Sequence, residues 1–314
     1  MSLPSFLHTD RPFLPLNLGG NPFGWTADRE ATFAVLDRFV EGGGTFVDTA
    51  DSYSAWVDGH EGGESERLIG AWMSERGNRD DVAVATKVCK KPDRMGLAHD
   101  NVVRALEESL ERLGTDHVDL YYLHYDDEAV AIADQVRTFH SLVEDGRARA
   151  VGLSNFSPER MREWFETARR EGLTVPAAIQ PRYTLVSRMG YERDYAPLVA
   201  EFGPAVFPYP ALASGFLTGK YRTEADFEGA ARGSAAKRYA EAGGLRVVDA
   251  LVQVGERHGA EPATVALAWL LAKGVTAPIA SASRPEQLDV LLAAPGLSLS
   301  EADVEQLDAT SAGF

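Results

Sequence analysis

The sequence predicts an α/β fold in which eight parallel strands alternate with helices and close into a (β/α)8, or TIM, barrel. Short apolar segments rich in β-branched residues recur eight times, at about residues 14–18, 45–49, 82–88, 118–124, 148–154, 177–180, 205–209 and 275–280. Helical patterns separate nearly all of them, which favours a parallel sheet. The rival fold, an open doubly wound sheet, would normally carry a Gly-x-Gly-x-x-Gly turn, and the chain has none.

The first strand–helix unit has clear local signals. Its strand ends in a glycine turn, and the helix expected over residues 28–41 carries Phe33, Leu36 and Val40 on one face. The glycines that follow end this helix. A second strand, TFVDTA, then runs over residues 45–50.

The middle of the chain continues the alternation. A glycine-rich loop leads to a helix over residues 65–76, and the strand VAVATKV (82–88) is apolar on both faces, as in a sheet covered on both sides. Apolar residues repeat at helical spacing over 100–113 and 129–145. A further helix opens at residues 157–158, because serine followed by proline is a typical helix start.

The last part of the chain holds three more strands, AAIQP, AVFPYP and VTAPIAS. Residues 211–244 are poorly patterned and rich in Gly and Ala, and a loop of that length in a compact domain is usually functional. Because no domain boundary is visible, residues 1–314 are expected to form a single domain.

Composition narrows the classes of partner. The net charge of −16 argues against nucleic acid and anionic membranes as partners. The chain has one cysteine, so no disulfide framework is expected and a reducing cytoplasm is the default. The first residues lack the pattern of a signal peptide, and no stretch reaches 18 apolar residues. We therefore expect a cytoplasmic protein.

Polar residues follow six consecutive strands at their carboxyl ends, where a barrel of this type places its active site. Lys87 ends an apolar strand and needs an anion nearby, because a buried ammonium is costly unless it is paired. Six strands pointing polar groups at one mouth favour a shared site. These groups are Asp48, Lys87, His124, Ser154, Asn155, Gln180 and Tyr209.

Six segments form a specific combination: DTADSY (48–53), TKV (86–88), LHYDD (123–127), GLSNF (152–156), QPRYTLVSR (180–188) and ALASGFLTGKY (211–221). With them the chain resembles the aldo-keto reductase superfamily from about residue 12 to residue 310. The resemblance implies a barrel that binds a nicotinamide cofactor in extended form, without a Rossmann domain. It also implies that the long loop after the seventh strand covers the cofactor.

The resemblance assigns a catalytic tetrad of Asp48, Tyr53, Lys87 and His124. Tyr53 would be the general acid that protonates a carbonyl oxygen while hydride reaches the carbon. A neighbouring Lys87 cation is expected to lower the pKa of the phenol, whose ordinary value is about 10. Asp48 would keep Lys87 charged, and His124 would orient the substrate oxygen.

The resemblance also assigns cofactor contacts. Ser154, Asn155 and Gln180 would bind the nicotinamide amide, Tyr209 would stack on its ring, and other residues would line the ribose, pyrophosphate and adenosine phosphate. The remaining cofactor positions are Gly20, Asn21, Asp48, Ala211, Leu212, Gly215, Lys220, Ser281, Ser283, Arg284 and Gln287. Trp25, Trp56 and Tyr125 would line the substrate pocket. No metal is expected.

The chain departs from the family at a few of these positions. Pro210 replaces a common serine and removes a backbone donor, Ser283 stands at a common arginine position, and Leu291 replaces an asparagine. Arg284 and Lys220 still favour a 2′-phosphate, so NADPH is expected to be preferred, with NADH as a second option.

The sequence therefore predicts an NADPH-dependent reductase that converts aldehydes or ketones to alcohols, with a small carbonyl compound as its partner. Two alternatives stay open. One is an NAD(P)-linked alcohol or sugar dehydrogenase working in reverse, and the other is a cofactor-binding redox-sensor subunit with slow turnover. The oligomeric state is open as well.

Overall fold

The computed structural model describes residues 4–7, 9 and 11–314. Its main sheet has eight strands, all paired in parallel. In sheet order these are β10 (Ile279–Ala280), β1 (Asn17–Gly19), β2 (Phe46–Asp48), β3 (Ala83–Val88), β6 (Leu120–Leu123), β7 (Val151–Ser154), β8 (Ala178–Gln180) and β9 (Ala205–Val206). The eight predicted strands are therefore confirmed as parallel, with shorter bounds at most ends.

The two outer strands of this order also lie against each other. Beyond the ladder of β1 and β10, the backbone N–H of Thr276 donates to the carbonyl of Val206 at 2.9 Å, and that of Ile279 donates to Pro208 at 3.0 Å. The sheet is therefore curled, and residues at its two ends are joined by backbone hydrogen bonds.

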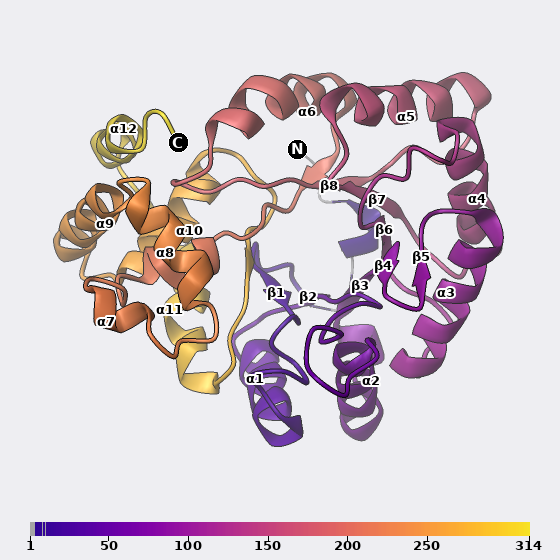
Figure 1. Cartoon of the computed structure of the whole chain (residues 1–314), viewed down its shortest axis with the longest axis horizontal. Helices are drawn as coiled ribbons and strands as arrows, with labels where there is room; N and C mark the ends of the chain where they lie inside the picture. The colour runs from indigo at the N-terminus through magenta and orange to yellow at the C-terminus, as the bar shows by residue number, and fades with distance from the viewer. Residues whose placement is uncertain (1–3, 8, 10) are drawn as a thin grey trace.

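Helices surround the curled sheet in chain order (Figure 1). The pairs α1 and α2, α3 and α4, and α5 and α6 occupy successive sectors, and α9 to α12 complete the ring on the far side. Their bounds are α1 (Arg29–Glu41), α2 (Glu64–Arg76), α3 (His99–Leu113), α4 (Ile132–Glu144), α5 (Pro158–Glu171), α6 (Ala196–Phe202), α9 (Leu245–His258), α10 (Pro262–Ala272), α11 (Leu288–Leu292) and α12 (Glu301–Thr310).

The predicted helix ends are set by local chemistry. The side chain of Asp28 accepts the backbone N–H of Ala31 and caps α1, and Ser157 caps α5 in the same way through Arg160. Pro158 occupies the first turn of α5, where no backbone donor is needed. Gly114 ends α3 with φ of +64°, a conformation that suits glycine.

Aromatic residues seal the amino-terminal end of the strands. Phe6, from the short 3₁₀ helix Ser5–Leu7, has its ring centroid 6.2 Å from those of both Phe46 and Phe207. The Phe46 and Phe207 centroids are 5.1 Å apart, and all three rings are buried. These buried rings fill the space at the amino-terminal end of the strands.

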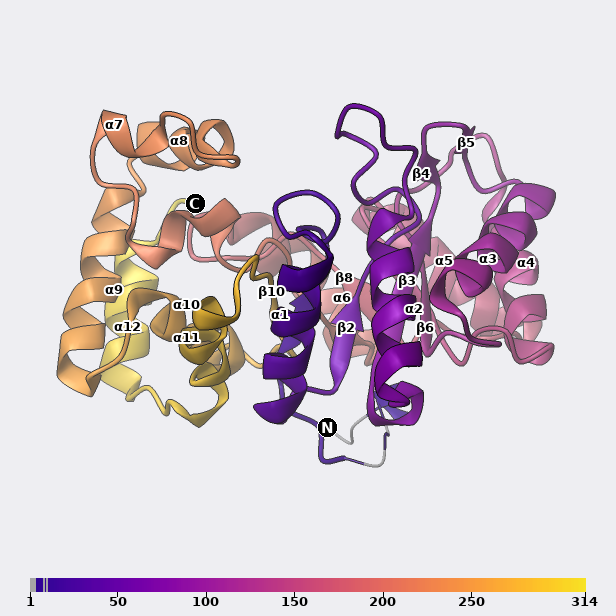
Figure 2. The same cartoon turned by 90° about the horizontal axis from the view of Figure 1, so that it is seen from below.

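Two features were not predicted from the sequence. Residues 90–95 form a hairpin of β4 (Lys90–Lys91) and β5 (Arg94–Met95). The stretch 211–244, expected as an unpatterned loop, contains the 3₁₀ helix Ala213–Thr218, α7 (Glu224–Phe227) and α8 (Gly233–Glu241). Figure 2 shows this hairpin together with α7 and α8 at one end of the molecule, opposite the N-terminus. Among the described helices, none combines the length and the apolar composition that spanning a bilayer requires.

Candidate active site

The site is built around Lys87, near the carboxyl end of β3. Its Nζ donates to Asp48 Oδ2 at 2.5 Å, to the carbonyl of Thr49 at 2.7 Å and to the hydroxyl of Tyr53 at 2.9 Å. Lys87 and Asp48 are 0% and 1% exposed. The anion that the sequence required for this buried ammonium is therefore present, one strand away on β2.

Asp48 connects the lysine to β8 on the other side of the mouth. Its second oxygen, Oδ1, accepts a hydrogen bond from Gln180 Nε2 at 2.9 Å, and the Tyr53 hydroxyl lies 3.4 Å from Oδ2. Both carboxylate oxygens thus have donors, which satisfies a charge that would be costly to bury alone. The carboxylate fixes the position of Lys87 and, through it, that of the Tyr53 hydroxyl.

His124 lies beside the phenol. The ring centroids of His124 and Tyr53 are 6.0 Å apart, and its Nδ1 is buried with no hydrogen-bond partner among the residues that the structure describes. Burial lowers the pKa of the imidazole well below its usual range, and the charges of Lys87 and Lys90 lower it further. The ring is therefore neutral at neutral pH and can exchange a hydrogen bond with a ligand oxygen.

The pKa of Tyr53 is shifted in the direction opposite to the expected one. Burial raises the pKa of the Tyr53 phenol well above its ordinary value, and the Asp48 carboxylate raises it further. Burial also lowers the pKa of Lys87, while the contact with Asp48 opposes that effect. Lost hydration and the nearby anion, which the expectation for Lys87 did not include, set the direction of the shift.

These groups face a cavity of about 1390 Å³ at the carboxyl ends of the strands. All the predicted site residues line this cavity except Gly20, Trp25, Lys87 and Ser154. Lys87 and Ser154 are buried behind the wall, and Gly20 holds it in place through its backbone bonds to Asp48 and Ser65. The volume exceeds that of ordinary small-ligand pockets, so it has room for a dinucleotide and a substrate together.

The residues predicted to bind the nicotinamide amide are hydrogen-bonded to one another. Asn155 Nδ2 donates to the carbonyl of His124 at 2.8 Å and to Ser154 Oγ at 3.0 Å, and the Tyr209 hydroxyl donates to Asn155 Oδ1. Ser154 Oγ donates to the carbonyl of Gln180 at 3.0 Å. Four of these polar groups therefore form one connected network beside Asp48.

The far end of the cavity is lined by small and cationic residues. Gly215 adopts φ of +86°, and a Cβ there would lie 3.3 Å from Lys220 Cε and Nζ, so glycine leaves room for that lysine. Ser281 Oγ donates to Asn21 Oδ1 at 2.7 Å, and the backbone N–H of Ser283 donates to Gln287 at 2.8 Å. Backbone and hydroxyl donors beside cations suit the phosphates of a dinucleotide.

Aromatic residues form the mouth. The Trp56 ring is 51% exposed and makes edge contacts with Tyr53 and Trp25, with centroids 6.1 Å and 5.6 Å away. Tyr125 packs beside His124 at 5.2 Å. Trp56 and Tyr125 line the cavity, whereas Trp25 packs against Trp56 outside the lining.

The sequence model of the Aldo/keto reductase family matches residues 15–312. The chain belongs to this family. It is 32% identical to norsolorinic acid reductase stcV of Emericella nidulans over 94% of this chain and 78% of the relative. It is 30% identical to an aryl-alcohol dehydrogenase [NADP(+)] of Phanerodontia chrysosporium (94% and 82%) and 33% identical to a putative voltage-gated potassium channel subunit beta of Schizosaccharomyces pombe (83% and 78%). The protein is thus an oxidoreductase of the aldo/keto reductase family.

Sequence reasoning missed two cations in the cavity of this aldo/keto reductase. Lys90 lies on the unpredicted hairpin, and Arg232 lies at the start of α8 with its guanidinium 5.6 Å from the Trp25 ring centroid. Neither position carries a periodic signal, because each is placed by elements that the sequence pattern did not reveal.

A further missed group is Asp51, three residues after Asp48 in the reductase motif DTADSY. It is fully buried, and neither carboxylate oxygen has a hydrogen-bond partner within the described part of the chain. Burial raises the pKa of this carboxyl to about 8, and Glu66 raises it further, while three cations oppose the shift: Arg112, Arg94 and Lys91. Its backbone N–H donates to the carbonyl of Lys87 at 3.1 Å, which places it directly behind the tetrad.

Proposed function

We propose that this enzyme reduces an aldehyde or ketone to an alcohol with NADPH, and that Tyr53 donates the proton. The observation that carries this proposal is the contact of Lys87 with both Asp48 and Tyr53 at the wall of a cavity large enough for cofactor and substrate. A buried, hydrogen-bonded phenol beside an open cavity is a general acid in position for a bound carbonyl oxygen.

A bound nicotinamide cofactor supplies the hydride that the carbonyl carbon accepts. As charge develops on the oxygen, Tyr53 gives it the phenolic proton, and His124 donates a hydrogen bond that orients it. The phenolate left behind is stabilised by the Lys87 ammonium 2.9 Å away. Carbon gains two electrons and a hydrogen, oxygen gains the proton, and the products are the alcohol and the oxidised cofactor.

Burial raises the pKa of Tyr53, so the phenol is protonated at neutral pH. This is the form that the proposed reduction needs, whereas the alcohol dehydrogenase alternative needs the phenolate as a base. We further propose that the chain is one domain whose sheet closes into a (β/α)8 barrel, with residues 211–244 covering the cofactor.

NADPH is proposed over NADH because Lys220 and Arg284 line the far end of the cavity. The name of the Phanerodontia chrysosporium relative, which includes NADP(+), points the same way. Arg284→Ala is expected to weaken NADPH binding about tenfold and to leave NADH binding unchanged, since hydrogen bonds to charged groups contribute roughly 1.5–3 kcal/mol. Fluorescence titration with both cofactors measures this, and equal losses for the two would contradict the assignment.

Tyr53→Phe tests the chemistry. We expect it to retain NADPH affinity and to lose at least about a hundredfold in the rate of aldehyde reduction, the usual contribution of a general acid. Unchanged turnover would refute the role of Tyr53. The similarity to a putative potassium channel subunit is the reason to test the redox-sensor alternative. Single-turnover oxidation of bound NADPH by an aldehyde distinguishes a sensor from an enzyme, because a sensor would leave the cofactor reduced for minutes.

A further inference from the structure

One cation at the substrate end of the cavity has no acidic partner among the described residues. Lys90 lines the wall next to Pro92, Tyr125 and His124, and its Nζ lies 4.3 Å from the centroid of the Tyr125 ring. The structure pairs no described carboxylate with it, whereas the adjacent Lys91 makes an ion pair with Asp93 at 2.7 Å. In a chain of net charge −16, an ammonium left over an aromatic ring and facing a cavity is available to a ligand.

The other free cations of the cavity form a separate group. Burial lowers the pKa of Lys220, and the charges of Arg232 and Arg284 lower it further, so these three lie close enough to repel one another. They suit the several phosphates of a dinucleotide. The charge of Lys90 acts instead on His124, and Lys90 is not among the charges that shift the pKa of Lys220. Lys90 is therefore placed for a second anion, next to the group that would hold the substrate oxygen.

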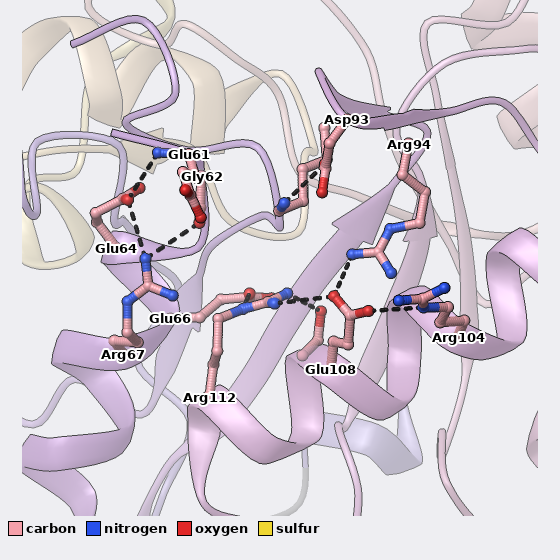
Figure 3. A network of polar contacts seen from close by, with 12 residues as sticks. Glu61, Gly62, Glu64, Glu66, Arg67, Asp93, Arg94, Arg104, Glu108 and Arg112 are labelled. Carbon is pink, nitrogen blue, oxygen red and sulfur yellow. Dashed lines mark hydrogen bonds and ion pairs between the residues drawn. The ribbon is translucent and has the colours of Figure 1, made fainter. Parts of the chain in front are cut away.

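The hairpin that carries Lys90 is fixed by a network of ion pairs (Figure 3). Arg94 of β5 pairs with Glu108 of α3, and Glu108 also contacts Arg104 and Arg112. Arg112 in turn pairs with the buried Glu66 of α2 at 2.6 Å. The backbone that carries the Lys90 ammonium is thus held in place by these ion pairs. A rigid backbone lowers the entropic cost of binding an anion.

We propose that the substrate end of the cavity selects aromatic aldehydes that carry a carboxylate, and that Lys90 is the counter-ion of that carboxylate. The inference rests on the proposed function, because it places the aldehyde oxygen at Tyr53 and His124. Trp56 and Tyr125 supply the apolar faces against which an aromatic ring would pack. The carboxylate then reaches the Lys90 ammonium at the rim of the same wall.

The test compares two substrates of nearly equal shape, 4-carboxybenzaldehyde and methyl 4-formylbenzoate, with NADPH as reductant. The measured quantity is the preference, defined as the ratio of kcat/KM for the acid to that for the ester. We expect the wild-type enzyme to prefer the acid through a lower KM. Lys90→Met should lower this preference about tenfold, and Lys90→Arg should restore most of it because the charge returns.

Arg193→Met is the matched control, since it removes an exposed cation outside the cavity lining and should leave the preference unchanged. Wild-type enzyme that reduces the ester as well as the acid, or a Lys90→Met variant that keeps the wild-type preference, would overturn the inference. Those results would leave the proposed function intact, because the ester is still reduced. Failure of wild-type enzyme to reduce either compound would refute the proposed function itself.

Discussion

Replacing Asp51 by asparagine should make the protein more stable at neutral pH. The folded protein holds this carboxyl with a pKa of about 8, against 3.8 for an exposed aspartate, because burial and Glu66 disfavour its charge. Between these two values the unfolded chain has lost the proton and the folded chain still holds it. Stability therefore falls as pH rises, in the direction opposite to that of an ion-paired carboxylate.

The size of the effect follows from the shift. Each pKa unit corresponds to about 1.36 kcal/mol. The free energy of unfolding of the wild-type protein is therefore roughly 4 kcal/mol lower at pH 7 than at a pH below 4. Asparagine has a similar shape and stays neutral, so it avoids this cost. Asp51→Asn should thus gain about 3 kcal/mol relative to wild type between pH 5 and pH 7, from two pH units at that slope.

Urea unfolding at pH 5, 6 and 7 measures the difference in the free energy of unfolding between the two proteins. Asp58→Asn is the control, because Asp58 is an exposed aspartate on the same loop between β2 and α2. The control should keep the wild-type slope. If wild type and Asp51→Asn lose stability in parallel between pH 5 and pH 7, the buried carboxyl does not hold its proton and the reasoning fails.

Two further outcomes complete the tests given with the proposed function. The reductive kcat should be nearly flat from pH 5 to pH 7, below the pKa of about 8 of the buried Asp51, because burial raises the pKa of Tyr53 and lowers that of His124. A bell-shaped profile centred near pH 6 would contradict this. Gly70→Ala should destabilise the protein by about 1–3 kcal/mol in urea unfolding, because its Cβ would lie 2.4 Å from the Arg112 carbonyl where α2 packs on α3. Gly190→Ala, with open space around its Cβ and helical φ of −61°, is the matched control, and an equal effect in both variants would exclude the clash.

The strands and the buried ion pair could be predicted because their signals are local. VAVATKV alternates over β3, and a lysine at the end of such a strand demands an anion, which Asp48 supplies. The β4–β5 hairpin could not be predicted in this way. Its strands have two residues each, and they are held by partners distant in sequence, such as Glu108 for Arg94.

The direction of the pKa shift of Tyr53 could not be predicted from the sequence for a different reason. The sequence identifies the residues around the Tyr53 phenol. Whether the pKa of the phenol is raised or lowered, however, depends on how much of its hydration is lost on folding, which the sequence does not show. The same holds for Asp51, which reads as an ordinary polar residue of a turn and is in fact fully buried. Residue identity predicted which groups meet; depth of burial decided how they titrate.

The cluster of Phe6, Phe46 and Phe207 lies at the amino-terminal end of the strands, away from the cavity at their carboxyl ends. Phe6 precedes the first strand, so a shortened N-terminus would strip a ring from Phe46 and Phe207 and expose them to water. Such a truncation would lower the stability of the fold, while the contacts among Asp48, Tyr53 and Lys87 at the other end of the strands would be kept. Tags and deletions at the N-terminus should therefore be judged by melting temperature, and kinetic constants alone would overlook the damage.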